Sequence, residues 1–323
     1  MTYVYTLAYE AEERECAEAE CWAMLGADAC GRKLVATDAC VDVSRAAHIA
    51  LCVRQMAAAD SFDALQRAVE ALQCCAEGFR MVVVKQGEAR RTGPGSDEVA
   101  RRLADVIHGR PNLSAPRMLF ACVGSDEGWH FGRVESRTDR GWVVHGAKPY
   151  TFSNSLPSRL ARTMVNLAAQ PGDTILDPCC GAGSILIEAA SMGIRAVGFD
   201  ANKKMTSHAR DNLLHFGLPP LVAAGDARHI GGRYDAIVTD LPYGWTSSPD
   251  ARLYAAVLTN LRRLAPRLSV VLGSDASAEI SGAGWRILRH ARQPKGQLCR
   301  HVYVCEANKG LERPTIASTR GTP

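Results

Sequence analysis

The chain has 323 residues, and its 47% hydrophobic and 22% charged content is that of a folded globular protein with two or three domains. It has no apolar run of membrane-spanning length, and residues 1–30 hold too many glutamates for a signal peptide. Twelve cysteines without a secretory signal predict free thiols, and neither they nor His208, His215 and His229 show metal-binding spacing. We therefore expect a cytoplasmic protein without a membrane segment or a metal centre.

The formal net charge of +4 is distributed unevenly along the chain. Residues 80–117, here called the first basic segment, contain eight basic and four acidic residues and so account for the whole surplus. Residues 285–301, here called the hairpin basic segment, contain five Lys or Arg residues and no acid. Two such segments suggest a polyanionic partner, although arginines on solvated helix faces give the same pattern.

The first 136 residues indicate two small α+β units. Residues 1–60 begin with a strand, 3-YVYTLAY-9, followed by a Glu/Ala-rich helix and a second helix around residues 45–58. Residues 61–136 begin with an amphipathic helix, 61-SFDALQRAVEALQ-73, in which Ser61 is the expected N-cap. The other elements of this unit are a strand at 79–85, a helix at 97–109, and paired strands at 117–123 and 129–135. This second unit carries the first basic segment.

A different periodicity begins near residue 156, after a linker at 137–155. The expected strands and helices alternate, with strands at 174–177, 196–200, 221–226, 234–240 and 269–274 and helices at 156–167, 183–193, 202–217 and 250–265. This alternation predicts a doubly wound parallel sheet, an α/β domain with a Rossmann-like fold over residues 156–310. The pattern also predicts a hairpin from 284–292 and 298–306, and a tail at 311–323.

The stretch 173-DTILDPCCGAGSILIEAA-190 has the order strand, acid, Gly-rich turn, helix. Gly181 and Gly183 let the backbone approach a ligand, and the helix that follows presents free N–H groups. The stretch does not match G-x-G-x-x-G and has no lysine to cradle a phosphate. With Asp177 at the strand tip, the turn favours a ligand that carries a cationic amine, such as S-adenosylmethionine.

Four consecutive predicted strands of this domain each end on an aspartate, namely Asp177, Asp200, Asp226 and Asp240. Ligands of open α/β sheets bind at the carboxyl ends of the strands. One aspartate there is usually a helix cap, but four caps in succession are a much less common coincidence. The pattern predicts a ligand site, in which Asp200 accepts hydrogen bonds from a ribose diol.

The segments D-P-C-C-G-A-G-S, G-F-D and D-L-P-Y-G resemble those of class I S-adenosylmethionine-dependent methyltransferases that modify exocyclic amines. The unit at 61–136 resembles a THUMP RNA-binding domain, preceded at 1–60 by a ferredoxin-like region. The chain as a whole is similar to the tRNA guanine-N2 methyltransferases. Its D-L-P-Y-G-x-[ST]-S segment most resembles the enzymes that act on guanosine 10 of tRNA. Leu241 departs from the D-P-P-Y tetrad that is usual in this family.

The resemblance implies a role for each matched position. S-adenosylmethionine is the implied cofactor and tRNA the implied partner, with a small zinc-binding activator subunit, known for some relatives, as a second candidate partner. The implied cofactor-binding residues are Asp177, Pro178, Cys179, Gly181, Gly183, Asp200, Asp226 and Ala227, with Asp226 on the adenine amine. The implied catalytic residues are Asp240, Leu241, Pro242 and Tyr243. The predicted RNA-binding residues are Lys85, Arg90, Arg91, Arg101 and Arg102.

Residues 240–243 suit the chemistry of a guanine N2 amine, whose lone pair is delocalised into the ring. We expect Asp240 to accept one amine hydrogen and the backbone carbonyl of Leu241 the other, which aims the lone pair at the methyl donor. Pro242 holds Leu241 in an extended conformation, so this carbonyl keeps its direction without a proline at 241. We expect Tyr243 to stack on a flipped base.

Other interpretations stay open at this point. The same chemistry fits another RNA guanosine, at position 6 of tRNA or in ribosomal RNA, and either one or two methyl groups. A protein methyltransferase acting on a glutamine amide has a related tetrad that usually begins with Asn, so Asp240 and the basic unit argue against it. The intact Asp240, Pro242 and Tyr243 argue against a non-catalytic RNA-binding scaffold.

Overall fold

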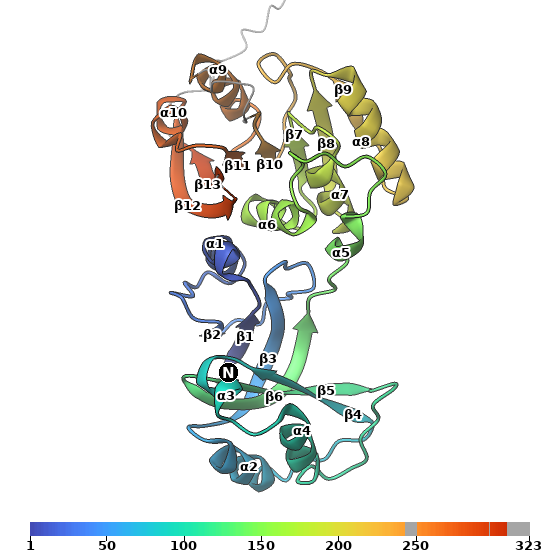
Figure 1. The fold of residues 1–323 in the computed structure, drawn as a ribbon, viewed down its shortest axis with the longest axis vertical. Helices are drawn as coiled ribbons and strands as arrows, with labels where there is room; N and C mark the ends of the chain where they lie inside the picture. The colour runs from blue at the N-terminus through green and yellow to red at the C-terminus, as the bar shows by residue number, and fades with distance from the viewer. Residues whose placement is uncertain (243–250, 297, 309–323) are drawn as a thin grey trace, which may run out of the picture.

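The computed structural model describes residues 1–242, 251–296 and 298–308 and consists of two parts, each built around one β-sheet (Figure 1). The N-terminal part holds a six-stranded sheet in the order β2-β1-β3-β6-β5-β4. The C-terminal part holds a seven-stranded sheet in the order β12-β13-β11-β10-β7-β8-β9. The two parts follow one another along the long axis of the molecule.

The N-terminal sheet is mostly antiparallel, with β4 and β5 as its parallel pair. Its strands are β1 (Tyr3–Leu7), β2 (Leu34–Thr37), β3 (Ile49–Ala59), β4 (Phe79–Lys85), β5 (Met118–Ser125) and β6 (Gly128–Arg137). Helices α2 (Phe62–Ala71) and α4 (Ser96–Ala104) bury Leu65 and Leu103 in one core cluster with strand residues such as Phe120. The Ser61 hydroxyl accepts a hydrogen bond from the Ala64 N–H at 3.3 Å, so the predicted N-cap is confirmed.

The prediction of a second helix around residues 45–58 is wrong, because residues 49–59 form strand β3. This strand lies inside the sheet and pairs with β1 on one side and β6 on the other. The alanines at 57–59 favour a helix locally. Two neighbouring strands satisfy the N–H and C=O groups of β3, and Ile49, Leu51 and Val53 become buried there, so tertiary pairing outweighs the local preference.

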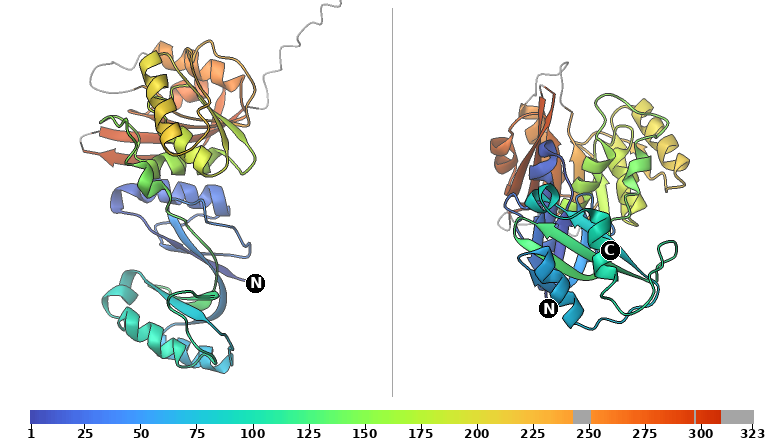
Figure 2. Two further views of the ribbon diagram at one scale, coloured as in Figure 1. Left: turned by 90° about the vertical axis from the view of Figure 1, so that its right-hand side faces the viewer. Right: turned by 60° about the horizontal axis from the view of Figure 1, so that its bottom comes forward.

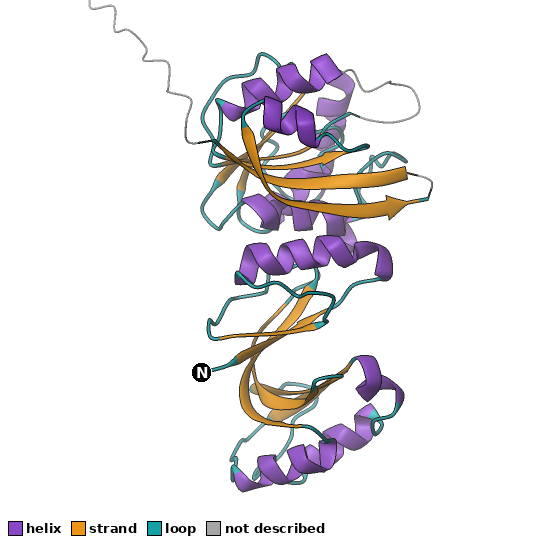
Figure 3. Ribbon diagram, turned by 90° about the vertical axis from the view of Figure 1, so that its left-hand side faces the viewer, coloured by secondary structure: helices purple, strands orange, loops and turns teal. Residues whose placement is uncertain are grey.

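The two units expected at 1–60 and 61–136 contribute strands to the same sheet. β1, β2 and β3 come from the first unit, and β4, β5 and β6 come from the second. The pairing of β3 with β6, from Leu51↔Arg137 to Ala59↔Trp129, joins them. Long strands of this part are strongly curved (Figure 3). The two predicted units therefore form one sheet, whose backbone hydrogen bonds cross the boundary between them.

The C-terminal sheet has the alternating order that the sequence predicts, with a hairpin at one edge. Its strands are β7 (Thr174–Asp177), β8 (Arg195–Asp200), β9 (Val222–Ala224), β10 (Ala236–Asp240), β11 (Arg267–Leu272), β12 (Trp285–Lys295) and β13 (Leu298–Ala307). Its helices are α6 (Ser158–Ala168), α7 (Ser184–Ser191), α8 (Lys203–His215), α9 (Ala251–Arg262) and α10 (Ser277–Gly282). One core cluster joins the sheet to α6, α7 and α8, and a second joins it to α9 and α10. The result is a doubly wound α/β sandwich.

Helix α1 (Arg14–Leu25) belongs to the N-terminal part but lies between the two sheets (Figure 2). Its Cys16 lies in the core cluster of α6 and α7. Its buried Glu20 accepts hydrogen bonds from the N–H groups of residues 47 and 48, at 2.9 and 2.7 Å, and from the Asn166 amide of α6 at 2.7 Å. Burial raises the pKa of Glu20. One helix therefore packs on both parts and hydrogen-bonds to both.

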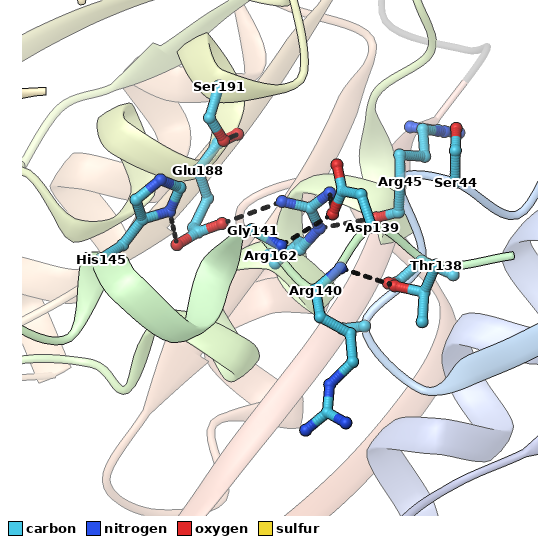
Figure 4. A network of polar contacts seen from close by, with 12 residues as sticks. Ser44, Arg45, Thr138, Asp139, Arg140, Gly141, His145, Arg162, Glu188 and Ser191 are labelled. Carbon is cyan, nitrogen blue, oxygen red and sulfur yellow. Dashed lines mark hydrogen bonds and ion pairs between the residues drawn. The ribbon is translucent and has the colours of Figure 1, made fainter. Parts of the chain in front are cut away.

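A second buried network holds the linker to α6 and α7 (Figure 4). The Arg162 side chain, only 2% exposed, donates to the Arg45 carbonyl at 2.8 Å and to Asp139 and Glu188 at 2.9 and 3.3 Å. Glu188 also lies 2.8 Å from Nδ1 of His145. Separating the two parts would take the Arg45 carbonyl away from the buried Arg162 guanidinium, although Arg162 and Glu188, on α6 and α7, would keep each other as partners.

All twelve cysteines are free thiols, as the composition predicts. Within the described ranges, no helix has both the length and the apolar character needed to cross a membrane.

Candidate active site

The carboxyl ends of neighbouring strands bring the predicted aspartates to one edge of the C-terminal sheet. Asp240, Asp177 and Asp200 are the last residues of β10, β7 and β8, and Asp226 follows the end of β9. These four strands are adjacent in the order β10-β7-β8-β9 and run parallel. Asp240 comes last of the four aspartates in the sequence and Asp177 comes first. The strand order nevertheless makes them neighbours, which the sequence alone does not reveal.

Asp177 is the most enclosed of these aspartates, with 1% of its surface exposed. Its Oδ1 accepts hydrogen bonds from the Thr239 hydroxyl at 2.9 Å and from the Cys179 N–H at 3.2 Å. Burial raises the pKa of Asp177 to about 8, and the charges of Asp240 and Asp200 add to this rise. A cationic group bound nearby would favour the ionised carboxylate, so this environment fits the amine of S-adenosylmethionine.

Asp200 holds the Gly-rich turn directly. Its Oδ2 accepts the Gly181 N–H at 2.9 Å, and its Oδ1 accepts the Asn202 N–H at 2.8 Å. Each oxygen keeps a second lone pair, so the carboxylate can still accept two ribose hydroxyls. Gly181 has φ +50°, and a Cβ on it would meet no atom within 4 Å. The turn thus leaves room beside Gly181 that a bound cofactor can occupy.

Other predicted residues of this turn have packing roles. Gly183 has φ +85° and precedes α7, and a Cβ there would come within 3.2 Å of the Ala209 Cβ on α8. Pro178 is buried, and Cys179 packs against the core cluster of α9. These three residues shape the turn whether or not they touch a ligand.

Asp226 has a partner that the sequence analysis did not identify. Arg228 donates to both carboxylate oxygens, from Nε at 3.0 and 3.1 Å and from Nη2 at 2.5 Å. These contacts lower the pKa of Asp226 well below its usual range. The Asn260 amide of α9 donates to the carbonyls of Ala227 and Ile230 at 2.9 and 3.1 Å, which fixes the loop that follows Asp226. An adenine amine at Asp226 would share the carboxylate with Arg228.

The segment after β10 is anchored from two sides. The buried Leu241 donates its N–H to the Val271 carbonyl of β11 at 3.2 Å, which continues the sheet beyond Asp240. The Tyr254 hydroxyl of α9, which the sequence analysis missed, donates to the Pro242 carbonyl at 2.8 Å. Tyr243, Trp245, Thr246 and Ser247 lie outside the described residues.

Lys295, from the hairpin basic segment, lies at this same edge. Its Nζ donates to the Ser153 carbonyl at 2.8 Å, so the tip of the β12–β13 hairpin reaches the linker before α6. Burial and the charge of Arg300 lower the pKa of Lys295, whereas the nearby charge of Asp240 opposes this change. The structure therefore adds a cation near Asp240. In the strand order, Lys295 lies on one side of Asp240, and Asp177 and Asp200 lie on the other side.

The five predicted RNA-binding residues have different surroundings. Arg90 and Arg91 end the short helix α3 (Gly87–Arg91), and Arg101 lies on α4; all three are exposed. Arg102 donates to Asp63 and to the Gln66 amide oxygen, at 2.6 and 2.5 Å, and lies over the Phe62 ring. Lys85 donates to the Pro94 carbonyl at 2.6 Å and thereby holds the loop before α4.

The fold agrees with comparisons to known proteins. The methyltransferase domain of the UPF0020 family, described as RMKL-like, matches residues 145–279. A tRNA (guanine(10)-N2)-dimethyltransferase of Pyrococcus abyssi is 32% identical over 223 residues, which cover 64% of this chain and 68% of the relative. The chain belongs to the tRNA guanine-N2 methyltransferase family.

A second member of this methyltransferase family is more similar over a shorter stretch. The tRNA (guanine(10)-N2)-dimethyltransferase of Methanothermobacter thermautotrophicus is 47% identical over 105 residues, and this match spans 31% of each chain. The match therefore covers less than two thirds of that relative's length. The crystal structure of TrmN from Thermus thermophilus has a TM-score of 0.51 and 20% identity, and the match covers 95% of this chain and 100% of that one. The C-terminal part thus has the Rossmann-like fold of the class I methyltransferases.

Proposed function

We propose that this chain methylates the exocyclic N2 amine of a guanosine in tRNA, at position 10, with S-adenosylmethionine as the methyl donor. The observation that carries the proposal is the position of Asp240, which ends β10 beside Asp177 at the carboxyl edge of a methyltransferase sheet. Position 10 is supported by the D-L-P-Y-G segment and by the names of the Pyrococcus and Methanothermobacter relatives.

The cofactor supplies a methyl group on a sulfonium when it is bound. In this proposal Asp177 and the turn at Gly181 bind the methionine portion, and Asp200 accepts the ribose hydroxyls. Asp226 and Ala227 bind the adenine, with Arg228 holding the Asp226 carboxylate in place. The raised pKa of Asp177 supports this arrangement, because a cationic amine would stabilise its ionised form.

Asp240 and the segment after it would orient the guanine amine. The Asp240 carboxylate accepts one amine hydrogen and the Leu241 carbonyl accepts the other, which directs the nitrogen lone pair at the methyl group. The Leu241 N–H, bonded to Val271, and the Pro242 carbonyl, bonded to Tyr254, hold this segment in place. Orienting two bound reactants contributes on the order of several kcal/mol to the lower barrier. After transfer, Asp240 accepts the proton that the nitrogen loses.

Binding of tRNA is assigned to the unit at 61–136, which we propose is a THUMP domain that follows a ferredoxin-like region at 1–60. Arg90, Arg91 and Arg101 are exposed and available to phosphates. Lys85 and Arg102 have intramolecular partners, so their main role in this proposal is to shape the surface that carries the other three. The linker at 137–155 then leads to the methyltransferase domain at 156–310, and Tyr243 would stack on the flipped base.

Two further expectations depend on a tRNA substrate. The reduced thiols and the substrate both fit the cytoplasm as the compartment. A small zinc-binding activator subunit stays a candidate partner, and the purified chain tests the need for one. Activity of the chain alone would remove the activator from the proposal.

The proposal is tested with the purified chain, in vitro transcribed tRNA and labelled S-adenosylmethionine, followed by mass spectrometry of the nucleosides. We expect N2-methylated guanosine at position 10, and loss of the product when G10 of the tRNA is replaced by A. The Asp240→Asn variant should lower the turnover rate by about 100-fold to 1000-fold, because it weakens the orienting acceptor and removes the proton acceptor.

Cofactor affinity separates the role of Asp240 from that of the cofactor site. The Asp240→Asn variant should bind S-adenosylmethionine within severalfold of the parent chain, whereas Asp200→Asn should bind it much more weakly. Loss of cofactor binding in the first variant would assign Asp240 to the cofactor site. Methyl transfer to a glutamine-containing peptide and not to tRNA would overturn the proposed substrate.

A further inference from the structure

The C-terminal hairpin brings together two histidines and an aspartate outside the proposed active site. Asp275 follows β11, His290 lies on β12 and His301 lies on β13. One ligand atom from each of these three side chains lies within 4.8 Å of the other two. Nε2 of His290 and Nδ1 of His301 are only 3.0 Å apart. We propose that these three residues bind a divalent transition-metal ion, with Zn²⁺ as the first candidate.

The strand pairing explains why the two imidazoles meet. In the hairpin register His290 lies opposite Tyr303, and Arg292 lies opposite His301. The two histidines are therefore diagonal neighbours on one face of the hairpin, a spacing that side chains can bridge. His301 also lies opposite Leu272, the last residue of β11, so Asp275 in the segment that follows this strand comes to the same place.

Hydrogen bonds and ring stacking hold two of these side chains in position. The Asp275 Oδ1 accepts hydrogen bonds from the Ser277 N–H and hydroxyl and from the Tyr303 hydroxyl, at 2.9, 2.7 and 2.8 Å. The ring of His290 stacks on that of Tyr303, with centroids 4.2 Å apart and planes at 11°. Fixed ligand orientation of this kind is typical of metal sites, where outer contacts set the direction of the ligands.

The distance between the two nitrogens fits a shared ion. Two imidazole nitrogens bound to Zn²⁺ at about 2.0–2.1 Å, with an angle of about 90–110° between them, lie about 2.9–3.4 Å apart. A simple hydrogen bond between neutral imidazoles also gives 3.0 Å, but it needs no carboxylate. A set of two imidazoles and one carboxylate favours Zn²⁺ or a related ion over Mg²⁺ and Ca²⁺, which prefer oxygen ligands.

The site would be open to solvent. Asp275 and His290 are exposed and His301 is half-buried. All three line a cavity of about 740 Å³, whose lining also includes Glu15 and Glu18 of the N-terminal part and Arg289 and Arg292 of β12. A bound ion would therefore keep one or more positions for water. It would cross-link β12, β13 and the end of β11 where the hairpin meets α1, without contact to Asp240.

The experiment uses the untagged full chain, stripped with a chelator and then titrated with Zn²⁺ by calorimetry and with Co²⁺ by visible absorption. We expect one equivalent to bind, with Co²⁺ ligand-field bands and a higher melting temperature. His290→Gln and His301→Gln should each abolish this binding, whereas His215→Gln, at an exposed histidine on α8, should leave it unchanged. Tyr303→Phe removes one hydrogen bond to Asp275 and should weaken binding roughly tenfold.

Melting of each metal-free variant shows whether the hairpin still folds. Binding that survives in His290→Gln and His301→Gln, or more than one equivalent of equal affinity, would assign the ion to scattered surface groups and overturn the site. Absence of binding in the parent chain would mean that the histidines are only hydrogen-bonded to each other. Neither readout needs tRNA or S-adenosylmethionine, so the site and the proposed function can fail separately.

Discussion

The arginines of the first basic segment and those of the hairpin basic segment have different neighbours. Within the described residues, Arg90, Arg91 and Arg101 form no salt bridge. In the hairpin, Arg289 pairs with Asp28 at 2.6 Å and Arg292 pairs with Glu15 at 3.0 Å. The first group is available to a polyanion, whereas acids of the N-terminal part already neutralise much of the second.

The difference shows that a local surplus of charge is not enough to locate a binding surface. Glu15 and Asp28 lie more than 250 positions before the arginines that they neutralise, so no sequence window contains both partners. Arg286 has its acid, Glu306, on the adjacent strand β13. Lys295, also in the hairpin segment, lies near Asp240.

Charge reversal of the first group should have the largest effect. The triple variant Arg90→Glu, Arg91→Glu, Arg101→Glu should weaken tRNA binding about 100-fold at low salt. The slope of log affinity against log salt concentration should become shallower by about two to three, because fewer counterions are released on binding. The measurement is a filter-binding series at several salt concentrations. The matched variant Arg286→Glu, Arg289→Glu, Arg292→Glu carries the same change in charge and should lose less affinity. Equal losses would mean that both segments contact the RNA.

The effect of pH should separate cofactor binding from RNA binding. Because the pKa of Asp177 is raised to about 8, a cationic cofactor must ionise it, and S-adenosylmethionine affinity should fall about tenfold from about pH 8 to about pH 6.5. Asp177→Asn should remove this dependence. The stability of the cofactor-free chain should change with pH in the opposite direction. Folding favours the protonated Asp177 carboxyl, so the free energy of unfolding should decline as pH rises from about 4 towards 8. Calorimetric titrations and thermal melts at each pH measure the two effects. A pH-independent affinity in the parent chain would contradict this environment for Asp177.

Neighbouring arginines of α4 give a smaller and more local test. Arg101→Ala should weaken tRNA binding severalfold, whereas Arg102→Ala should change it less than twofold. Arg102→Ala should instead lower the midpoint of denaturant unfolding, because Asp63 and Gln66 lose their partner and Phe62 loses a cation over its ring. Binding and denaturant unfolding are measured on the same preparations. If Arg102→Ala weakened tRNA binding more than twofold, Arg102 would be assigned to the RNA-binding surface.

The hairpin pairs should give the smallest effect. Exposed ion pairs contribute well under about 1 kcal/mol each, so Arg289→Glu should lower the melting temperature only slightly through repulsion from Asp28. Adding Asp28→Arg should restore the pair in reversed order, and the double variant should recover the loss. The coupling is read from a double-mutant cycle of thermal melts. No recovery would mean that the pair contributes nothing to the contact between the two parts.

Local signals predicted much of the fold. The alternation of strands and helices after residue 156 predicted the parallel sheet, and Ser61 predicted the start of α2, because periodicity and capping depend on residues close in sequence. Strand β3 was missed because its alanine-rich end favours a helix and its partners lie elsewhere in the chain. Helix α1 was found, but its packing against α6 was not, since a Glu/Ala-rich composition does not identify the surface that a helix contacts.

The features of the candidate site also fall into two groups, those that the sequence determined and those that only the tertiary structure decided. The sequence by itself determined that aspartates lie at or just after the ends of successive strands and that 240-DLPY-243 begins with one of these aspartates, because both depend on contiguous residues. Only the tertiary structure decided that Asp240 neighbours Asp177, that Tyr254 and Arg228 hold the loops, and that His290 and His301 meet Asp275. These relations arise from strand order and hairpin register, which bring together side chains that no local spacing connects.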